Sequence, residues 1–386
     1  MLVVAQASLV QALTIGSPQQ IGTISSSVLD EVSGLVDSRA NAGTFWVHND
    51  SGDSARFYAM SHGGELLGAF PLDGVTARDW EDMAIGPKAG GGNYLYLGDV
   101  GDNNAVRQNV AIHRVTEPLS TGGTTIGDNA YTTLQLNYPN GARDVESMFV
   151  DPISGELFLI TKRVSVPEVY NIPTSAFDNA MQTVTLNALG AFPELPYWAT
   201  AADISPDGRY ILVRSSTPSR GYLYERADGQ SVAEALHGEA IEIPLGSEIQ
   251  GEAIGWAAEG LSFFTTSEFS LFSSAPVYSY AFTPPAPALP GDYNDDQRVD
   301  AADYTIWRDL FGSSANLPNE TETLGQVTVE DYEVWRAHFG QSLGGAGVVA
   351  VPEPSVWLLI ISSSGLLVGA RRGSRSPAAA CPGACT

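Results

Sequence analysis

The residues with the clearest chemistry lie in one short run, residues 292–303. Oxygen atoms suited to metal binding recur there with the spacing of a calcium loop, at positions 1, 3, 5, 7, 9 and 12. The residues at these positions are Asp292, Asn294, Asp296, Arg298 (through its backbone carbonyl), Asp300 and Asp303. Position 6 is Gln297 instead of glycine, and position 12 is aspartate instead of glutamate. We predict a calcium site, because a tight loop of hard oxygen ligands suits that ion.

A second unit of the same kind follows at residues 320–340. Its helix-like segment 331–340 repeats most of 303–312, and we expect Trp307 and Trp335 to be core residues. Its loop carries Glu320, Glu322, Leu324, Thr328 and Asp331 at positions 1, 3, 5, 9 and 12. Since a leucine side chain cannot bind a metal, we expect weak metal binding or none there.

Residues 291–341 together resemble a type I dockerin, a small α-helical pair of EF-hand calcium loops. Aspartate at position 12, here Asp303, agrees with that family. The resemblance implies calcium as the cofactor and a cohesin-like protein as a partner.

Other carboxylates recur at the start of similar segments through the chain. The residues that begin the five segments are Glu31, Glu81, Glu146, Thr200 and Glu252. If the fold brings equivalent residues together, four carboxylates repel one another unless cations compensate. One interpretation of such a ring is a bound divalent cation, with calcium favoured by the oxygen ligands. The alternative is that each glutamate accepts backbone hydrogen bonds at its own strand.

Two loops, 48–53 and 98–103, repeat a pair of aspartates around a glycine. The aspartates are Asp50, Asp53, Asp99 and Asp102, and we group them with the ring as candidate metal ligands. Basic residues stand at the equivalent place in the next two repeats: Lys162, Arg163 and Arg214. This polarity suits an anionic ligand held by metal on one side and by cations on the other. It equally suits a self-neutralising surface.

Repeated β-rich segments must position these residues. The repeats begin near residues 31, 81, 146, 200 and 252, and each contains several short β-rich runs. Four short strands per repeat of roughly 50 residues is typical of propeller blades. The fifth repeat lacks an outer strand, which the segment 21–27 can supply. We predict an all-β fold with a five-bladed β-propeller; the alternative is a sixth blade hidden between residues 81 and 146.

Several segments resemble the calcium-binding phytase-like and esterase-like propellers of secreted bacterial proteins. The resemblance covers about residues 20–283. It rests on EVSGL (31–35), HNDSGD (48–53), RDWEDMAIG (78–86), NYLYLGDVGDN (93–103) and QGEAI (250–254). It implies calcium in the channel and at the rim, and phosphate binding in true phytases. The chain lacks the dense Lys/Arg cluster that a polyphosphate substrate requires.

No motif singles out a catalytic group, because the sequence has no nucleophile elbow, zinc-protease helix, phosphate loop or dinucleotide fingerprint. The leading interpretation is a module that binds a glycan or matrix component. The first alternative is a metal-dependent (phospho)ester hydrolase of the phytase-like type. The second, a carbohydrate-active hydrolase, requires paired carboxylates and exposed aromatics such as Trp46, Trp80 or Trp256. We expect these tryptophans to pack between blades instead.

The composition of the chain limits the classes of partner that it can bind. Lys and Arg total 19 against 44 Asp and Glu, a formal charge of −25. Such a chain repels nucleic acid and attracts divalent cations. Cys381 and Cys385 are the only cysteines, so we expect no disulfide in the folded body.

A short proline-containing motif and an apolar span lie near the C-terminal end. Pro352, Glu353 and Pro354 precede an apolar span, 356–370, and a basic pair. Residues 351–372 resemble a PEP-CTERM sorting tail, which implies a transmembrane helix, a sorting protease that cuts at the motif, and a body outside the membrane. The span is shorter than the ~20 residues of a typical crossing helix. We therefore expect an exported protein at the cell surface or outside the cell, anchored transiently or permanently by its C-terminus.

The remaining segments complete the predicted organisation. Residues 1–15 are interpreted as a signal-peptide remnant, with an ordinary N-terminal strand as the alternative. The predicted order is then the propeller (16–283), a proline-rich linker (284–290), the dockerin-like module (291–341), a glycine-rich linker (342–350), the sorting tail (351–372) and a tail without an assigned role (373–386).

Overall fold

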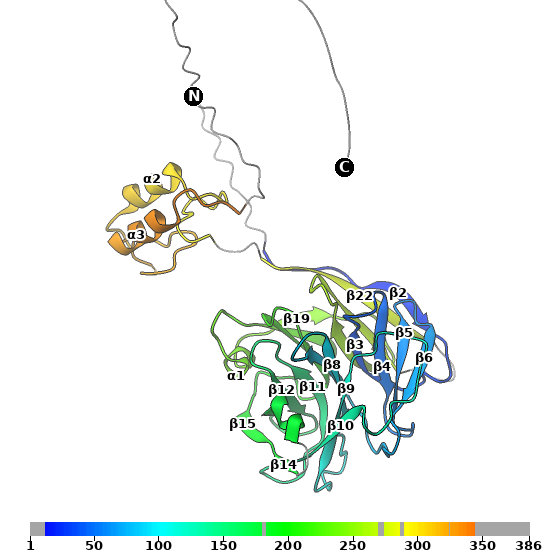
Figure 1. Cartoon of the computed structure of the whole chain (residues 1–386). Helices are drawn as coiled ribbons and strands as arrows, with labels where there is room; N and C mark the ends of the chain where they lie inside the picture. Colours follow the sequence, from blue (N-terminus) through cyan, green and yellow to red (C-terminus); the bar gives the residue numbers. More distant parts are fainter. Residues whose placement is uncertain (1–11, 180–182, 269–273, 286–288, 324, 344–386) are drawn as a thin grey trace, which may run out of the picture. The chain divides into compact units, whose positions relative to one another are not determined.

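Five β-sheets form the larger part of the molecule. A computed structural model describes residues 12–179, 183–268, 274–285, 289–323 and 325–343. The chain divides into two compact units between residues 287 and 288, within the segment predicted as a linker. In the first unit the sheets are arranged as the blades of a propeller (Figure 1). The five-bladed β-propeller is therefore confirmed, and the described residues contain no sixth blade.

Each of the first four blades runs antiparallel from its inner strand outward. Blade one contains β3 (Val32–Asp37), β4 (Thr44–Asn49), β5 (Arg56–Ser61) and β6 (Leu66–Pro71). Blade two contains β7 (Met83–Pro87), β8 (Asn93–Asp99), β9 (Val110–Thr116), β10 (Tyr131–Asn137) and, parallel to β10, the short β14 (Val184–Thr185). Blade three contains β11 (Val145–Val150), β12 (Glu156–Thr161), β13 (Glu168–Pro173) and β15 (Asn187–Ala191). Blade four contains β16 (Ala199–Ile204), β17 (Tyr210–Ser216), β18 (Ser219–Glu225) and β19 (Ile241–Pro244). Two short helical segments lie in loops: η1 (Thr174–Asn179) and α1 (Val232–Leu236).

Both ends of the propeller segment meet in blade five. Its strands β20 (Gly251–Trp256), β21 (Ser262–Ser267) and β22 (Ala275–Thr283) come from the end of the unit. The outer position is filled by β2 (Gln19–Ile24) and β1 (Thr14–Ile15), which both pair antiparallel with β22. The predicted spare strand thus closes the ring, and closure removes an open sheet edge. Thr14 and Ile15 belong to this blade, so the strand interpretation holds for that end of the segment 1–15; residues 1–11 lie outside the described residues.

Apolar side chains fill the spaces between neighbouring blades. Every residue of β3, β11 and β16 is buried, as expected for inner strands covered on both faces. Trp46 and Trp80 share one apolar cluster between blades one and two, and Trp256 packs between blades four and five. The expectation that these tryptophans pack between blades is confirmed.

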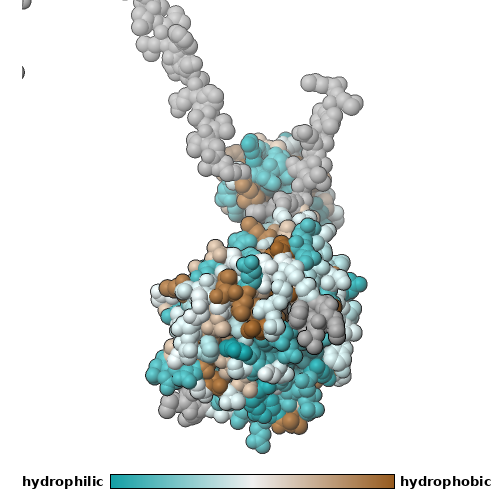
Figure 2. All heavy atoms as spheres, turned by 90° about the vertical axis from the view of Figure 1, so that its right-hand side faces the viewer, coloured by the Kyte–Doolittle hydropathy of each residue, from teal (hydrophilic) through white to brown (hydrophobic). Residues whose placement is uncertain are grey.

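Few large apolar side chains are left on the outer strands. Figure 2 shows one face of the molecule with hydrophobic areas bordered by hydrophilic ones. Ile21 on β2 and Leu67 on β6 are among the exposed apolar residues, at 41% and 39% exposure. Most other apolar residues of the repeats are buried in the cores between blades.

Buried carboxylates link the inner strands of different blades. Asp82 Oδ1 accepts a hydrogen bond from the Met83 amide, and Oδ2 accepts from the amides of Met148 (2.8 Å) and Ala202 (3.1 Å). This one side chain therefore joins blades two, three and four. Asp203 forms the same kind of link between inner strands, because its Oδ2 accepts a hydrogen bond from the Trp256 amide at 2.7 Å. Burial raises the pKa of Asp82 well above its ordinary value and that of Asp203 to about 6.

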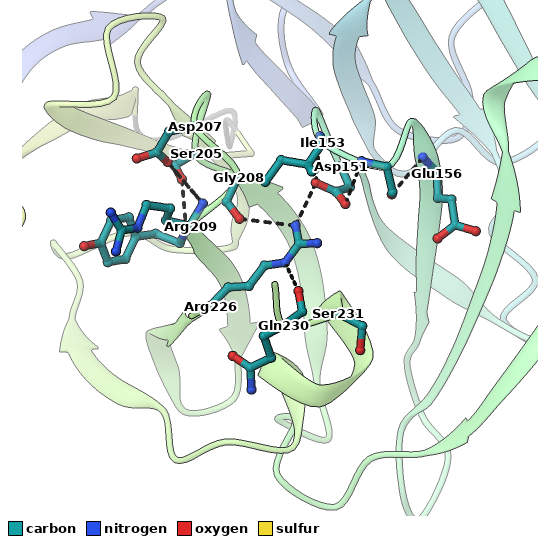
Figure 3. A network of polar contacts seen from close by, with 12 residues as sticks. Asp151, Ile153, Glu156, Ser205, Asp207, Gly208, Arg209, Arg226, Gln230 and Ser231 are labelled. Atoms are coloured by element: carbon teal, nitrogen blue, oxygen red, sulfur yellow. Dashed lines mark hydrogen bonds and ion pairs between the residues drawn. The ribbon is translucent and has the colours of Figure 1, made fainter. Parts of the chain in front are cut away.

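Blades three and four are also joined by a buried ion pair. Asp151 follows β11 and accepts hydrogen bonds from its own turn, including the Ile153 amide at 3.1 Å. Arg226, just after β18, reaches across to Asp151 at 2.9 Å and donates to the Gln230 carbonyl at 2.6 Å (Figure 3). The aspartate thus holds its own turn and the neighbouring blade together.

The second unit contains two helices, α2 (Ala301–Leu310) and α3 (Val329–His338). Its small core consists of Tyr293, Leu317 and Val327, with Trp307 and Trp335 packed against it. The two indoles make reciprocal bonds: Trp307 Nε1 donates to the Thr328 carbonyl at 2.6 Å, and Trp335 Nε1 to the Asp300 carbonyl at 2.8 Å. Both tryptophans pack into the core, as the repeat predicted.

No helix in the described part of the chain is long and apolar enough to cross a membrane. The predicted span 356–370 and the sorting residues Pro352, Glu353 and Pro354 lie outside the described residues.

Candidate metal centre

Carboxylates from three blades lie close together at the mouth of the propeller, near ends of the strands β4, β7 and β11. Asp50 directly follows β4, Asp79 and Glu81 precede β7, and Asp144 and Glu146 lie at the start of β11. Within the described residues, oxygen atoms of Asp50, Asp79 and Glu81 lie within 4.8 Å of one another, and so do those of Glu81, Asp144 and Glu146. The two triads share Glu81. We call these five residues the mouth cluster.

Glu81 is a buried carboxylate of the mouth cluster that lacks a compensating partner in the described part of the chain. Glu81 is only 4% exposed. Its carboxylate has no hydrogen bond or ion pair among the described residues. A Cβ atom on Gly101 would overlap Glu81 Oε1 and the Asp79 carboxyl group. The glycine of the loop 98–103 therefore lets the backbone approach two carboxylates, which explains its presence better than turn formation does.

The carboxylates of the mouth cluster repel one another when they are charged, and burial further disfavours their charged forms. Burial, followed by the charge of Asp50, raises the pKa of Asp79 to about 6. Burial and the neighbouring Glu146 raise the pKa of Glu81 well above its ordinary value, and burial raises that of Asp50. A proton or a cation can relieve such repulsion, and shifts of this kind gather at functional sites.

Two further glutamates from blade five share this electrostatic environment. Burial raises the pKa of Glu252 to about 7, with Glu146 among the contributing charges. Burial and the charges of Asp50 and Glu31 raise the pKa of Glu268 to about 7. The acidic character of the mouth thus extends around to the last blade.

Basic side chains of blade three neutralise part of the mouth cluster. Lys162 forms an ion pair with Glu146, and Arg163 pairs with both Asp144 and Glu146. Arg163 adopts a left-handed backbone conformation, with φ at 62°. Cation and carboxylate therefore alternate on this side, as the self-neutralising alternative expected, whereas Asp50, Asp79 and Glu81 have no cation of their own among the described residues.

Arg214 is not available to an anionic ligand. Its side chain is 0% exposed and pairs with Glu248, which is buried equally well. The guanidinium also donates to the Ala253 carbonyl at 3.1 Å. It lies where a Cβ atom on Gly251 would stand, so that glycine is required for the packing. Arg214 is thus a structural link between blades four and five.

The predicted ring divides in the structure. Glu81 and Glu146 enter the mouth cluster, Glu252 lies in the same environment, and Glu31 is exposed. Thr200 donates to the Gly251 carbonyl at 3.4 Å. Equivalent positions therefore lie at one mouth without forming one symmetrical set of ligands.

The repeated loops also divide by role. Asp50 joins the mouth cluster, whereas Asp53 binds Arg56 (2.9 Å) and the Tyr58 hydroxyl (2.6 Å). Asp99 accepts from the Asp79 amide at 3.2 Å and from Arg107 at 2.7 Å. Asp102 accepts from the Arg107 amide at 2.6 Å. The last three aspartates therefore position the backbone and side chains around the cluster.

Sequence reasoning gave too little weight to Asp79, Asp144 and Arg107. The first two lie two residues before a ring glutamate, and in extended backbone that spacing places both carboxylates on one side. Arg143, which directly precedes Asp144, pairs with Glu168 at 2.5 Å. No sequence signal marked Arg107, which reaches Asp99 from an irregular loop.

A polar pocket of about 360 Å³ lies beside the cluster, between blades three, four and five. Its lining includes Lys162, Arg163, Trp198 and Glu252, with serine and threonine hydroxyls from the β17–β18 turn. The Arg163 guanidinium lies 5.6 Å from the centre of the Trp198 ring. This arrangement offers a ligand both charged and aromatic contacts.

The loop of the second unit is folded around its acidic side chains. Asp292 accepts from the amides of Asp296 (3.1 Å) and Gln297 (2.7 Å), and Asp303 accepts from that of Asn294 at 3.0 Å. Asp300 caps α2 through the Ala302 amide at 2.7 Å. These bonds curl the backbone so that positions 1 and 12 of the loop are both buried.

The loop fits a hard cation despite its departures from the calcium pattern. Gln297 has a φ of 68°, the left-handed conformation that glycine usually supplies at position 6. Burial and neighbouring carboxylates raise the pKa values of Asp292 and Asp303. The donors are oxygen atoms throughout, as calcium prefers.

Glu320 and Asp331 of the second loop each have one paired carboxylate oxygen, whereas Glu320 Oε1 and Asp331 Oδ1 are buried without a partner among the described residues. Asp331 Oδ2 accepts from the Thr328 amide at 2.8 Å, and Glu320 Oε2 from the Leu317 amide at 3.3 Å. Leu324 lies outside the described residues, so its position in the loop stays a prediction.

No protein-family model matches this chain, and no curated protein matches it.

Proposed function

We propose that this is an exported cell-surface protein whose propeller uses a divalent cation at its mouth to bind a ligand. The single observation that carries the proposal is Glu81, a buried carboxylate without a partner among the described residues that belongs to two carboxylate triads. A buried unpaired charge is expensive, and a cation converts the mutual repulsion into attraction. Oxygen donors alone favour calcium over softer metals.

The pocket beside the cluster supplies the place for the ligand. A cation held by Asp50, Asp79 and Glu81 would bind hydroxyl or carboxylate oxygens of a glycan or matrix component. Trp198 and the hydroxyls of Ser216, Thr217 and Ser219 line the same pocket. Aromatic and hydroxyl contacts suit a polyhydroxylated ligand, whose rings have both apolar faces and polar edges.

The second unit serves, in this proposal, as a dockerin-like calcium module. The calcium spacing of residues 292–303, the left-handed Gln297 and the two indoles that join the helices support it. Its partner would be a cohesin-like protein. The sorting signal at Pro352, Glu353 and Pro354 would deliver the protein to the outer surface, where a sorting protease acts on it.

Calcium titration of the full chain by calorimetry tests both proposed sites. Glu81→Gln should remove the propeller site and keep the loop site, because glutamine preserves size and removes the shared charge. The double variant Asp292→Asn/Asp303→Asn should do the reverse. The matched control is Glu225→Gln on blade four, which is exposed. A double variant that binds no calcium at all would refute the propeller site.

A metal-dependent phosphoester hydrolase is the second candidate. Its support is that Glu81 is shared, so two cations could lie side by side, as in two-metal sites that stabilise displacement at phosphorus. The cations Lys162 and Arg163 lie next to Glu146. Hydrolysis of p-nitrophenyl phosphate should then require calcium and be lost in Glu81→Gln. Calcium-dependent ligand binding without any turnover would favour the binding function.

A further inference from the structure

A second polar pocket, of about 350 Å³, lies on blade two, on the side that faces blade one. Its floor is the paired strands β9 and β10, and its wall is the loop from Gly74 to Arg78. This pocket shares no lining residue with the pocket beside the mouth cluster. The volume lies at the lower end of the range for small-molecule sites, about 300–1,000 Å³.

The sequence makes this pocket by placing polar residues where an inter-blade core needs apolar ones. On one face of β9 and β10, Ile112, Leu134 and Leu136 pack into the core between blades two and three. On the other face, the alternate residues His113, Thr133 and Gln135 line the pocket. Side chains alternate between the faces of a strand, so one pair of strands builds a core on one side and a polar hollow on the other.

Two polar atoms of the residues that line the pocket are buried without a hydrogen-bond partner among the described residues. His113 is 3% exposed, and its Nδ1 lies 2.8 Å from the Thr133 hydroxyl. Its Nε2 has no partner among the described residues, and neither does Arg107 Nε. Buried polar atoms are normally paired, so unpaired ones in a pocket wall indicate a ligand or water that completes them. Burial lowers the pKa of His113 to about 4, which leaves a neutral ring near pH 7.

The charges of the lining leave one positive charge uncompensated. Arg107 is paired with Asp99 at 2.7 Å, whereas the exposed Arg78 guanidinium has no ion pair among the described residues. His113 contributes no charge when neutral. The charged lining residues Arg78, Arg107 and Asp99 thus sum to one positive charge, in a chain whose formal charge is −25. A guanidinium fork matches a planar carboxylate through two parallel hydrogen bonds.

We propose that the blade-two pocket binds a single sugar acid, a hexuronate unit, independently of metal. Arg78 takes the carboxylate, and His113, Thr133, Asn109 and Gln135 take ring hydroxyls. The ligand carries one negative charge to match the one free cation, and several hydroxyls to match the row of neutral polar side chains. The mouth site needs a cation, so the two sites are separable.

Saturation-transfer NMR and calorimetry on the full chain in EDTA test this proposal. Glucuronate should bind at least tenfold more tightly than glucose, which lacks the carboxylate, and than acetate, which lacks the ring. Arg78→Gln should reduce glucuronate affinity at least tenfold and remove its advantage over glucose. Gln135→Ala should weaken glucuronate and leave acetate unchanged.

Arg220→Gln is the matched control, because Arg220 lies on blade four and is 39% exposed at its side chain. It should leave glucuronate affinity unchanged. Equal affinity for glucuronate and glucose, equal affinity for acetate, or an Arg78→Gln variant that binds like the wild type would each overturn the proposal. Because EDTA removes divalent cations, the result is independent of the mouth site: failure here leaves the calcium proposal intact, and the reverse also holds.

Discussion

Adjacent acidic residues at the start of β7 have opposite surroundings. Asp82 is fully enclosed and accepts three backbone hydrogen bonds from three blades, whereas Glu81 accepts none and lies in the mouth cluster. Alternation along extended backbone separates the two side chains. The sequence shows both carboxylates, but it cannot show which has backbone donors, because those donors come from blades far along the chain.

Asp82→Ala should lower the free energy of unfolding by about 3 kcal/mol or more, because three buried N–H groups lose their acceptor. Urea unfolding followed by tryptophan fluorescence measures the change. Asp228→Asn is the control, since Asp228 is exposed and exposed substitutions usually stay within about 0.5 kcal/mol. A loss no larger than that of the control would show that Asp82 does not join the blades energetically.

Glu252→Gln should change how stability depends on pH. In the metal-free chain the pKa of Glu252 is raised to about 7, above its unfolded value of about 4.3. The folded chain therefore takes up a proton that the unfolded chain does not, and stability gained at Glu252 grows as pH falls from 8 to 5. Glutamine imitates the protonated acid. The variant should be more stable than the wild type at pH 8, and this difference in stability should be smaller at pH 5.

Urea unfolding in EDTA at both pH values measures this difference, with the exposed Glu225→Gln as the control. A constant gap between Glu252→Gln and the wild type would contradict the raised pKa.

The elements themselves were largely readable from the sequence. The five inner strands begin close to the predicted repeat starts, and the closing strand β2 overlaps the predicted segment 21–27. Blade three is less regular, because the run 183–189 contributes both to β14 on blade two and to β15 on blade three. Loops were harder to predict: Gly101 and Arg107 act through contacts with residues of other loops, which no local pattern reveals.

Gly101→Ala should weaken calcium binding at the propeller mouth at least tenfold while the fold persists, because the added methyl group displaces Glu81 and Asp79. Calorimetry in the Asp292→Asn/Asp303→Asn background isolates the mouth site. Gly127→Ala is the control, since nothing lies within 4 Å of a Cβ atom there. Unchanged calcium affinity in Gly101→Ala would show that the loop does not shape the cluster.

At the scale of the whole molecule, the two units follow from two separate repeats in the sequence. The fivefold β repeat gives the propeller, and the helix-like repeat gives α2 and α3. The charge of the chain predicts attraction of divalent cations, but only the fold shows which carboxylates come together. Side chains from blades one, two and three meet in the mouth cluster, and their separation along the chain hides that meeting.

Removal of residues 1–24 should leave β22 as an unpaired edge strand, and such a strand promotes association with other chains. The propeller should also lose its cooperative unfolding, because the fifth blade is then incomplete. Removal of residues 1–11 keeps β1 and β2 and is the matched control. Light scattering and urea unfolding distinguish the two proteins. If the shorter chain stays monomeric and unfolds as cooperatively as the control, the fifth blade does not depend on its N-terminal strands.

The closure in blade five also sets the order in which the molecule can be made. Gln19 pairs with Ser279, so nearly the whole propeller segment must exist before β2 finds its place. Contacts between such distant positions must overcome the entropy of closing a long loop, which slows folding. During synthesis, which proceeds from the N-terminus, the first strand made waits as an unpaired segment until the last blade emerges. A chain that cannot complete its ring early stays incompletely folded for longer.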